Sequence, residues 1–215
     1  MPTDQPRDAQ RCAPCPVPAT GLLRVLDSDA ARVRRAAFGR LLATVAPVDV
    51  ATLAAVGHLS PTQIESALGD LAAAGAITRD PAGPVVAAGG LSVIPAQHWL
   101  RLAGRQFWTW CAFDGIGIPA TLDLDAALDT RCPHCGQPIQ VAIEAGRPPP
   151  DSSMVGWLPG GPCGNVQADF CPDANLFCND AHLAAWRTTV GDRPGTAATL
   201  PELADTGRQV WADLT

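Results

Sequence analysis

Hydrophobic residues in the first half of the chain recur at helical spacing. Between residues 31 and 46 an apolar residue returns about every fourth position, which predicts an amphipathic helix that ends before Pro47. Two further helices are predicted at 50–57 and 61–76. Ser60 is a favourable N-cap for the last of these, and Pro61 fits the first helical position, where its missing N–H costs no hydrogen bond.

A short hairpin is predicted to follow these helices, with strands at 77–80 and 84–88 joined by a Pro-Ala-Gly turn. Three helices and a two-stranded wing predict a winged-helix-like domain over 21–90. Its third helix lacks the Arg and Lys that a DNA reader uses for phosphate and base contacts, and its polar residues are Gln63, Glu65 and Asp70. We therefore interpret the domain as structural or protein-binding, with nucleic acid an unlikely partner.

The second half of the chain mixes short apolar runs with helical patterns. Strands are predicted at 91–94, 138–145 and 155–161, and helices at 107–118, 181–190 and 200–214. These elements lack a regular βαβ alternation, so the predicted fold class is α+β, with a mixed α/β domain of short strands over 91–215. Residues 1–20 are rich in proline and polar residues and are predicted to form a mobile tail.

Charge and composition narrow the function classes. The chain of 215 residues has a formal net charge of −6, which provides no basic field to attract nucleic acid. The first residues lack the apolar core of a signal peptide, and no apolar run is long enough to cross a bilayer, so a cytoplasmic protein without a membrane partner is expected.

One candidate site combines a thiol, a carboxylate and aromatic residues. On the predicted helix at 107–118, Cys111 and Asp114 are three positions apart and share a face beside Trp110. A thiolate is a nucleophile and a soft-metal ligand, and a carboxylate can carry a proton. Cys171, before Pro172, is expected near a helix N-terminus that would stabilise its thiolate. Both segments fit buried structural cysteines equally well.

Eight cysteines are many for a chain kept in a reducing compartment, where such a set more often binds metal than forms disulfides. Two Cys-x-x-Cys pairs, Cys12 with Cys15 and Cys132 with Cys135, are typical of a structural zinc site. Cys163 has no clear partner. The histidines expected to be structural or exposed rather than ligands are His58, His98 and His182.

Taken in order, three segments resemble the organomercurial lyase (alkylmercury lyase) family. They are FWTWCAFDGIGIPATL, RCPHCGQPIQV and ADFCPDANLFCND, which begin at residues 107, 131 and 168. The resemblance implies protonolysis of a carbon–mercury bond to a hydrocarbon and Hg(II), with catalytic residues Cys111, Asp114 and Cys171 also holding the product metal. The third cysteine of the family falls on Cys132.

Further expectations follow from the same resemblance. No organic cofactor is required, the substrates are small organomercurials, and the partners are low-molecular-weight thiols, needed to release Hg(II), and mercuric reductase. An apolar pocket lined by Trp110, Phe107 or Phe170 would exclude water from the reaction. Gly115 and Gly117 replace larger residues of the family pattern and are expected to widen or soften this pocket.

The additional thiols leave alternatives open. Cys135 and Cys178 lie close in sequence to the cysteines of the family pattern and would scavenge mercury or bind another metal. The chain could instead be a thiol-rich Hg- or Zn-binding protein, or a metal-responsive regulator, without lyase turnover. A third alternative is a relative that uses the same site for another thiol-dependent reaction.

Overall fold

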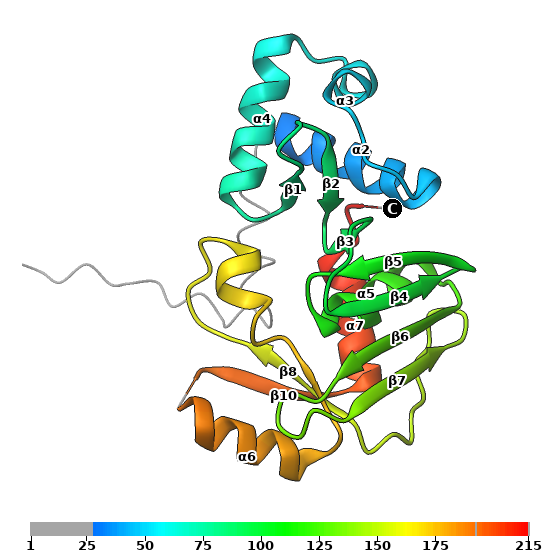
Figure 1. Ribbon diagram of the computed structural model, residues 1–215, viewed down its shortest axis with the longest axis vertical. Helices are drawn as coiled ribbons and strands as arrows, with labels where there is room; N and C mark the ends of the chain where they lie inside the picture. Colours follow the sequence, from blue (N-terminus) through cyan, green and yellow to red (C-terminus); the bar gives the residue numbers. More distant parts are fainter. Residues whose placement is uncertain (1–27, 192, 215) are drawn as a thin grey trace, which may run out of the picture.

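The computed structural model describes residues 28–191 and 193–214, in which helices surround two antiparallel sheets (Figure 1). The helices are α2 (Ser28–Thr44), α3 (Val50–Gly57), α4 (Pro61–Ala73), α5 (Ala112–Leu122), a short π-helix η1 (Val166–Phe170), α6 (Asp180–Val190) and α7 (Leu200–Val210). The predicted tail, with Cys12 and Cys15, lies outside the described residues.

The larger sheet has seven strands in the order β1-β2-β3-β5-β4-β6-β7. They are β1 (Ile77–Arg79), β2 (Val85–Ala88), β3 (Leu91–Ser92), β4 (His98–Leu102), β5 (Arg105–Thr109), β6 (Ala126–Arg131) and β7 (Pro138–Ile143). The smaller sheet has the order β10-β8-β9, with β8 (Val155–Pro159), β9 (Leu176–Phe177) and β10 (Gly195–Thr199). Antiparallel strands mixed with helices confirm the predicted α+β class.

The predicted helices of the N-terminal half are present, and α4 begins with the predicted cap residue and proline. Ser60 and Gln63 form a capping box at the start of α4, in which the Gln63 Oε1 accepts from the Ser60 N–H at 3.1 Å. Ile64 and Leu68 face the core. Strands β1 and β2 stand where the wing is predicted, but β2 also pairs with β3, so the larger sheet continues past residue 90. The winged-helix interpretation and the boundary at residue 90 stay predictions.

The helix predicted at 107–118 is wrong in its first part. Residues 105–109 form β5, which pairs with β4 in a register that places Trp99 opposite Trp108. Phe107 and Thr109 are fully buried and alternate with more open neighbours, which is the period of a strand, and aromatic residues favour such a surface. Helix α5 therefore begins only at Ala112.

Helix α5 is central to the molecule and contacts α7 and the large sheet. A Cβ on Gly117 would lie 2.3 Å from Cζ3 of Trp211, and one on Gly115 would lie 2.5 Å from Cδ1 of Leu128. These glycines therefore allow α5 to approach α7 and β6 closely, and the expectation that they widen the pocket is wrong. None of the helices in the described ranges is long and apolar enough to cross a membrane.

Candidate active site

Cys111, Asp114 and Cys171 come together in the interior. One ligand atom from each of the three lies within 4.8 Å of the others, and all three residues are buried. Cys111 is the N-cap residue of α5, Asp114 is in its first turn, and Cys171 directly follows η1. The tertiary structure thus unites two thiols and a carboxyl group separated by up to 60 positions in the sequence.

The start of α5 fixes the relative position of Cys111 and Asp114. Cys111 is extended, with φ −143° and ψ 170°, so it is not on a helical face shared with Asp114 as the sequence predicts. Instead the Asp114 carboxylate accepts a hydrogen bond from the Cys111 N–H at 3.1 Å, and the Thr109 hydroxyl donates to the Cys111 carbonyl at 2.8 Å. A carboxylate in the first turn also faces the positive end of the helix dipole.

Burial is the largest cause of the raised pKa values of Cys111 and Asp114. It raises the pKa of Asp114 to about 7, although hydrogen bonds from Cys111 and Trp110 oppose this change. Burial, a hydrogen bond with Cys171 and the nearby negative charge of Asp114 raise the pKa of the Cys111 thiol well above its ordinary value. The site therefore favours neutral thiols and a carboxyl group that can gain and lose a proton near neutral pH.

Cys171 differs from its prediction in one respect. It is the C-cap of η1 rather than a residue before a helix N-terminus, so no positive helix end stabilises its thiolate. The hydrogen bond with Cys111 lowers the pKa of Cys171, but burial and the charge of Asp114 together outweigh it, and the pKa is raised.

The N-terminal half of the chain holds the segment that carries Cys171. The Val166 N–H donates to the Ala74 carbonyl at 2.9 Å, and the Asn165 side chain donates to the Ala73 carbonyl at 3.0 Å. Gln167 likewise donates to the Gly75 carbonyl at 2.9 Å. The turn after α4 therefore positions η1, and through it the second sulfur of the site.

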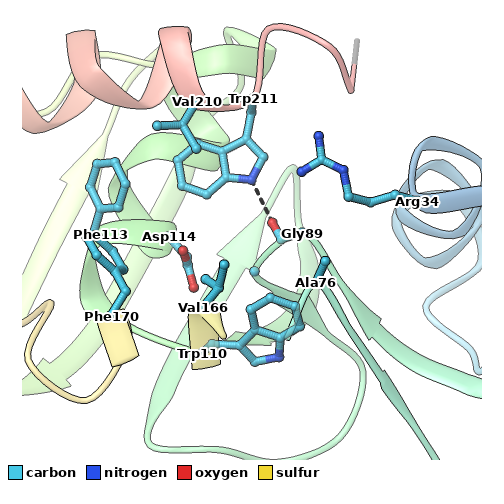
Figure 2. A pocket seen from close by; sticks show the side chains of 11 residues that line it. Arg34, Ala76, Gly89, Trp110, Phe113, Asp114, Val166, Phe170, Val210 and Trp211 are labelled. Carbon is cyan, nitrogen blue, oxygen red and sulfur yellow. Dashed lines mark hydrogen bonds between the residues drawn. The ribbon is translucent and has the colours of Figure 1, made fainter. Parts of the chain in front are cut away.

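A cavity of about 20 Å3 opens beside Asp114, which is room for about one water molecule (Figure 2). Its lining is mostly apolar and includes Trp110 and Phe170, as predicted, together with Phe113, Val166 and Trp211. Phe107, which was also expected there, is fully buried and is not among the lining residues. Such a lining keeps bulk water away from Asp114.

The turn between β2 and β3 and helix α2 complete the cavity. A Cβ on Gly90, where φ is +91°, would lie 2.7 Å from Cγ of Asp114, so only glycine lets the backbone approach this carboxyl group. The Trp211 indole donates to the Gly89 carbonyl at 2.6 Å. Arg34 reaches toward Trp211 from α2 (Figure 2). Its guanidinium forms an ion pair with Asp213.

Arg34 is a residue that sequence reasoning missed. It is 1% exposed, and its Nε and Nη1 atoms have no hydrogen-bond partner within residues 28–191 and 193–214. The sequence did contain one indication of its burial. Arg34 lies beside Val33 and Ala37 on the buried side of α2, where a charged side chain is unusual.

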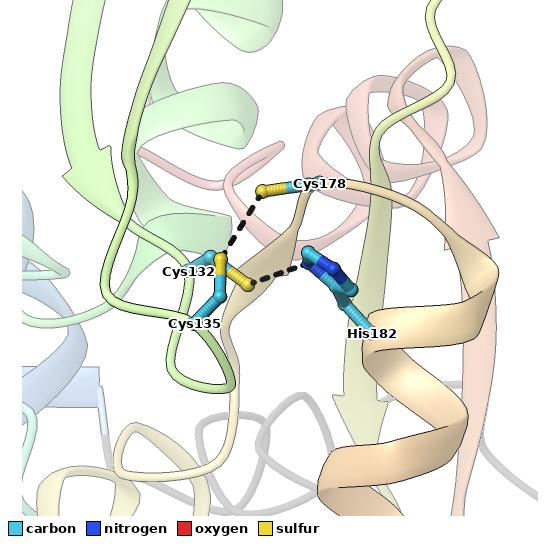
Figure 3. Close-up of side chains that lie close together, drawn as sticks. All are labelled: Cys132, Cys135, Cys178 and His182. Carbon is cyan, nitrogen blue, oxygen red and sulfur yellow. Dashed lines mark hydrogen bonds between the residues drawn. The ribbon is translucent and has the colours of Figure 1, made fainter.

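A second cluster lies beyond the end of β6, where Cys132, Cys135, Cys178 and His182 point toward one another (Figure 3). His182, which was expected to be structural, lies with its Nδ1 3.6 Å from the Cys132 Sγ. The predicted partners Cys12 and Cys15 lie outside the described residues. His98 is buried and bonded to Thr130 at 2.7 Å, consistent with the expected structural role, and burial lowers its pKa to about 4.

Comparisons with known proteins show similarity to alkylmercury lyases. The family model MerB, described as alkylmercury lyase, matches residues 91–212. The chain is similar to an alkylmercury lyase of Pseudomonas putida, with 31% identity over 46% of this chain and 49% of that protein. It is also similar to one of Streptomyces lividans, with 30% identity over 68% of this chain and 64% of that protein. The matched part thus spans less than two thirds of either relative.

Among solved structures, the chain resembles the crystal structure of the mercury-bound form of MerB2. The TM-score is 0.81 at 24% identity, and the match covers 92% of this chain and 97% of that one. This likeness extends over both halves of the chain and supports the α+β fold.

Proposed function

The chain belongs to the alkylmercury lyase family, and on that premise we propose that it cleaves carbon–mercury bonds of small organomercurials by protonolysis. The observation that supports this most directly is the buried set of two thiols and one carboxyl group, whose ligand atoms lie within 4.8 Å of one another. Mercury(II) is a soft ion that prefers sulfur, and the carboxyl group supplies the proton that the carbon needs.

The first step is capture of the substrate R–Hg–X by one thiol of Cys111 or Cys171. A sulfur–mercury bond forms, and X leaves with the proton of the thiol. Because both thiols have raised pKa values, they are protonated before substrate binds, and formation of the strong mercury–sulfur bond provides the driving force for losing the proton.

The second thiol then binds mercury and releases its proton to solvent, while Asp114 holds the proton that the carbon will receive. Two sulfur ligands increase the electron density on the carbon attached to mercury. Protonated Asp114 delivers its proton to that carbon, and the carbon–mercury bond breaks with its electron pair going to carbon. The products are RH and Hg(II) held by two thiolates, with Asp114 ionised and able to act as a further ligand.

The surroundings of Asp114 suit this role. Its pKa of about 7 is close to the value at which a group both gains and donates protons efficiently at neutral pH. Trp110 and Phe170 border the cavity and limit access of water, which would otherwise compete as a proton source and ligand. A cavity of about 20 Å3 also implies that Trp110 or a neighbour moves when a substrate enters.

The proposal extends to partners and cofactors. The reaction balances without an organic cofactor. Two thiolates bind Hg(II) tightly, so external low-molecular-weight thiols are required for turnover, and mercuric reductase is the expected acceptor. We place this activity in the cytoplasm, where such thiols are abundant.

Release of methane or benzene from methylmercury or phenylmercury with excess thiol tests the proposal. Wild type should release the hydrocarbon, and Cys171→Ser and Asp114→Ala should each release it at least about 100-fold more slowly. Cys163→Ser is the matched control, because Cys163 is outside the cluster, and it should retain activity. Equal rates in wild type and both site variants would contradict the proposal.

A further inference from the structure

The second cluster has the composition and spacing of a metal site and is separate from the proposed mercury site. We propose that Cys132, Cys135, Cys178 and His182 bind one structural Zn2+ ion, which links the β6–β7 hairpin to the segment where β9 leads into α6 (Figure 3). This site goes beyond the lyase activity and does not depend on it.

The distances fit a tetrahedral zinc ion. Zinc–sulfur bonds of about 2.3 Å place two sulfurs of a tetrahedron about 3.8 Å apart, and a zinc–nitrogen bond of about 2.0 Å gives a sulfur–nitrogen distance of about 3.5 Å. The Sγ atoms of Cys135 and Cys178 are 3.8 Å apart, and the Cys132 Sγ lies 3.6 Å from the His182 Nδ1. All four ligand atoms lie within 4.8 Å of one another.

The backbone around Cys132 is shaped to hold a metal-bound thiolate. The turn between the two cysteines is closed by a hydrogen bond from the Gly136 N–H to the Cys132 carbonyl at 2.8 Å, with Gly136 at φ +71°. The backbone N–H groups of Cys135 and Cys178 donate to the Cys132 sulfur. Such hydrogen bonds orient a sulfur ligand and stabilise its negative charge.

The histidine is fixed by the start of α6. Asn179 is the N-cap of this helix, and its side chain accepts a hydrogen bond from the His182 N–H at 2.9 Å. The cap places His182 in the first helical turn, four residues after Cys178, with its Nδ1 toward Cys132. The Asn179 cap therefore helps to position His182 beside Cys132, which is 50 positions earlier in the sequence.

The ligand set indicates a structural ion rather than a catalytic one. Three thiolates and one imidazole satisfy all four positions of tetrahedral zinc and leave none open for a substrate. The ion would join the large sheet to the small one, since Cys132 follows β6 and Cys178 follows β9. Cys178 is also seven residues after Cys171, so the zinc site would anchor one end of the segment that carries a sulfur of the mercury site.

Metal analysis of the full-length protein, purified under reducing conditions without mercury, tests this inference. Wild type should contain about one zinc per chain, and Cys178→Ser should lose most of it. Cys163→Ser is the matched control, because Cys163 and Cys178 are both half-buried cysteines and only Cys178 belongs to the cluster. The double variants Cys111→Ser/Cys171→Ser and Cys12→Ser/Cys15→Ser should both retain zinc.

A spectroscopic measurement covers the case in which Cys178→Ser does not fold. Wild type loaded with Co2+ should show the intense visible bands of tetrahedral cobalt and sulfur-to-cobalt charge transfer. His182→Cys should keep tetrahedral cobalt with stronger charge transfer, since a fourth sulfur replaces nitrogen.

Three results would overturn the inference. The first is wild type that binds neither zinc nor cobalt after reconstitution. The second is zinc that is lost from the Cys12→Ser/Cys15→Ser variant but kept by Cys178→Ser. The third is a disulfide between Cys135 and Cys178 in protein purified with a reductant.

Discussion

The Asp114 carboxylate accepts a hydrogen bond from the backbone N–H of Cys111 at 3.1 Å. This contact makes the proposed proton donor part of the helix start that presents the thiol. The position of the acid relative to the sulfur is therefore set by α5 itself, and it does not depend on a flexible loop.

Replacement of Asp114 by asparagine should separate mercury capture from carbon protonation. Asn keeps the size of the side chain and its ability to accept the Cys111 hydrogen bond, but it has no acidic proton. We expect hydrocarbon release to fall by about 100- to 10,000-fold, the usual contribution of a positioned acid, while Hg(II) binding by the two thiols persists. Single-turnover hydrocarbon release and Hg(II) titration measure the two properties, and loss of both together would contradict this assignment.

The rate of hydrocarbon release should depend on pH through Asp114. Because burial raises its pKa to about 7, the protonated form predominates below pH 7 and decreases above it. Under single-turnover conditions the rate should fall above pH 7, approaching about tenfold per pH unit. A rate that stays flat from pH 6 to pH 9 would argue against Asp114 as the proton donor.

Substitution of Gly117 should destabilise the contact between α5 and α7. In Gly117→Ala the new Cβ would lie 2.3 Å from Trp211 Cζ3 and 3.0 Å from Gly207 Cα, so the two helices must separate. Overpacking of this kind costs about 1–3 kcal/mol of unfolding free energy. Gly39→Ala is the control, because Gly39 is in α2 with nothing within 4 Å of its added Cβ, and it should be neutral or stabilising by up to about 1 kcal/mol. Chemical denaturation of both variants provides the comparison, and equal effects would contradict it.

The buried hydrogen bond of Trp211 should contribute to both stability and activity. Trp211→Phe leaves the Gly89 carbonyl without the indole donor at 2.6 Å, which costs about 1–3 kcal/mol of unfolding free energy. The neighbouring Gly90 contacts Asp114, so a shift of this backbone should also slow hydrocarbon release. Denaturation and hydrocarbon release measure the two effects. Trp99→Phe, in strand β4 away from the cavity lining, should change activity little.

The sequence by itself determined the features that depend on neighbouring residues. The Ser60 cap and Pro61 start α4 as predicted, and helical periodicity located α2, α6 and α7. The residues of the proposed mercury site were identified by their motifs, and the structure brings Cys111, Asp114 and Cys171 together. Caps, turns and periodicity act within a few positions along the chain, so they can be read without the fold.

Only the tertiary structure decided the features that depend on distant partners. Residues 105–109 form a strand because β4 supplies the hydrogen-bonding partner, and the helix therefore begins only at Ala112. His182 joins Cys132 across 50 positions because the two sheets meet there. Arg34 faces the cavity because α2 covers it. Each of these arrangements rests on strand pairing or on burial between separate elements, and local sequence patterns contain no information about which distant segment supplies the partner.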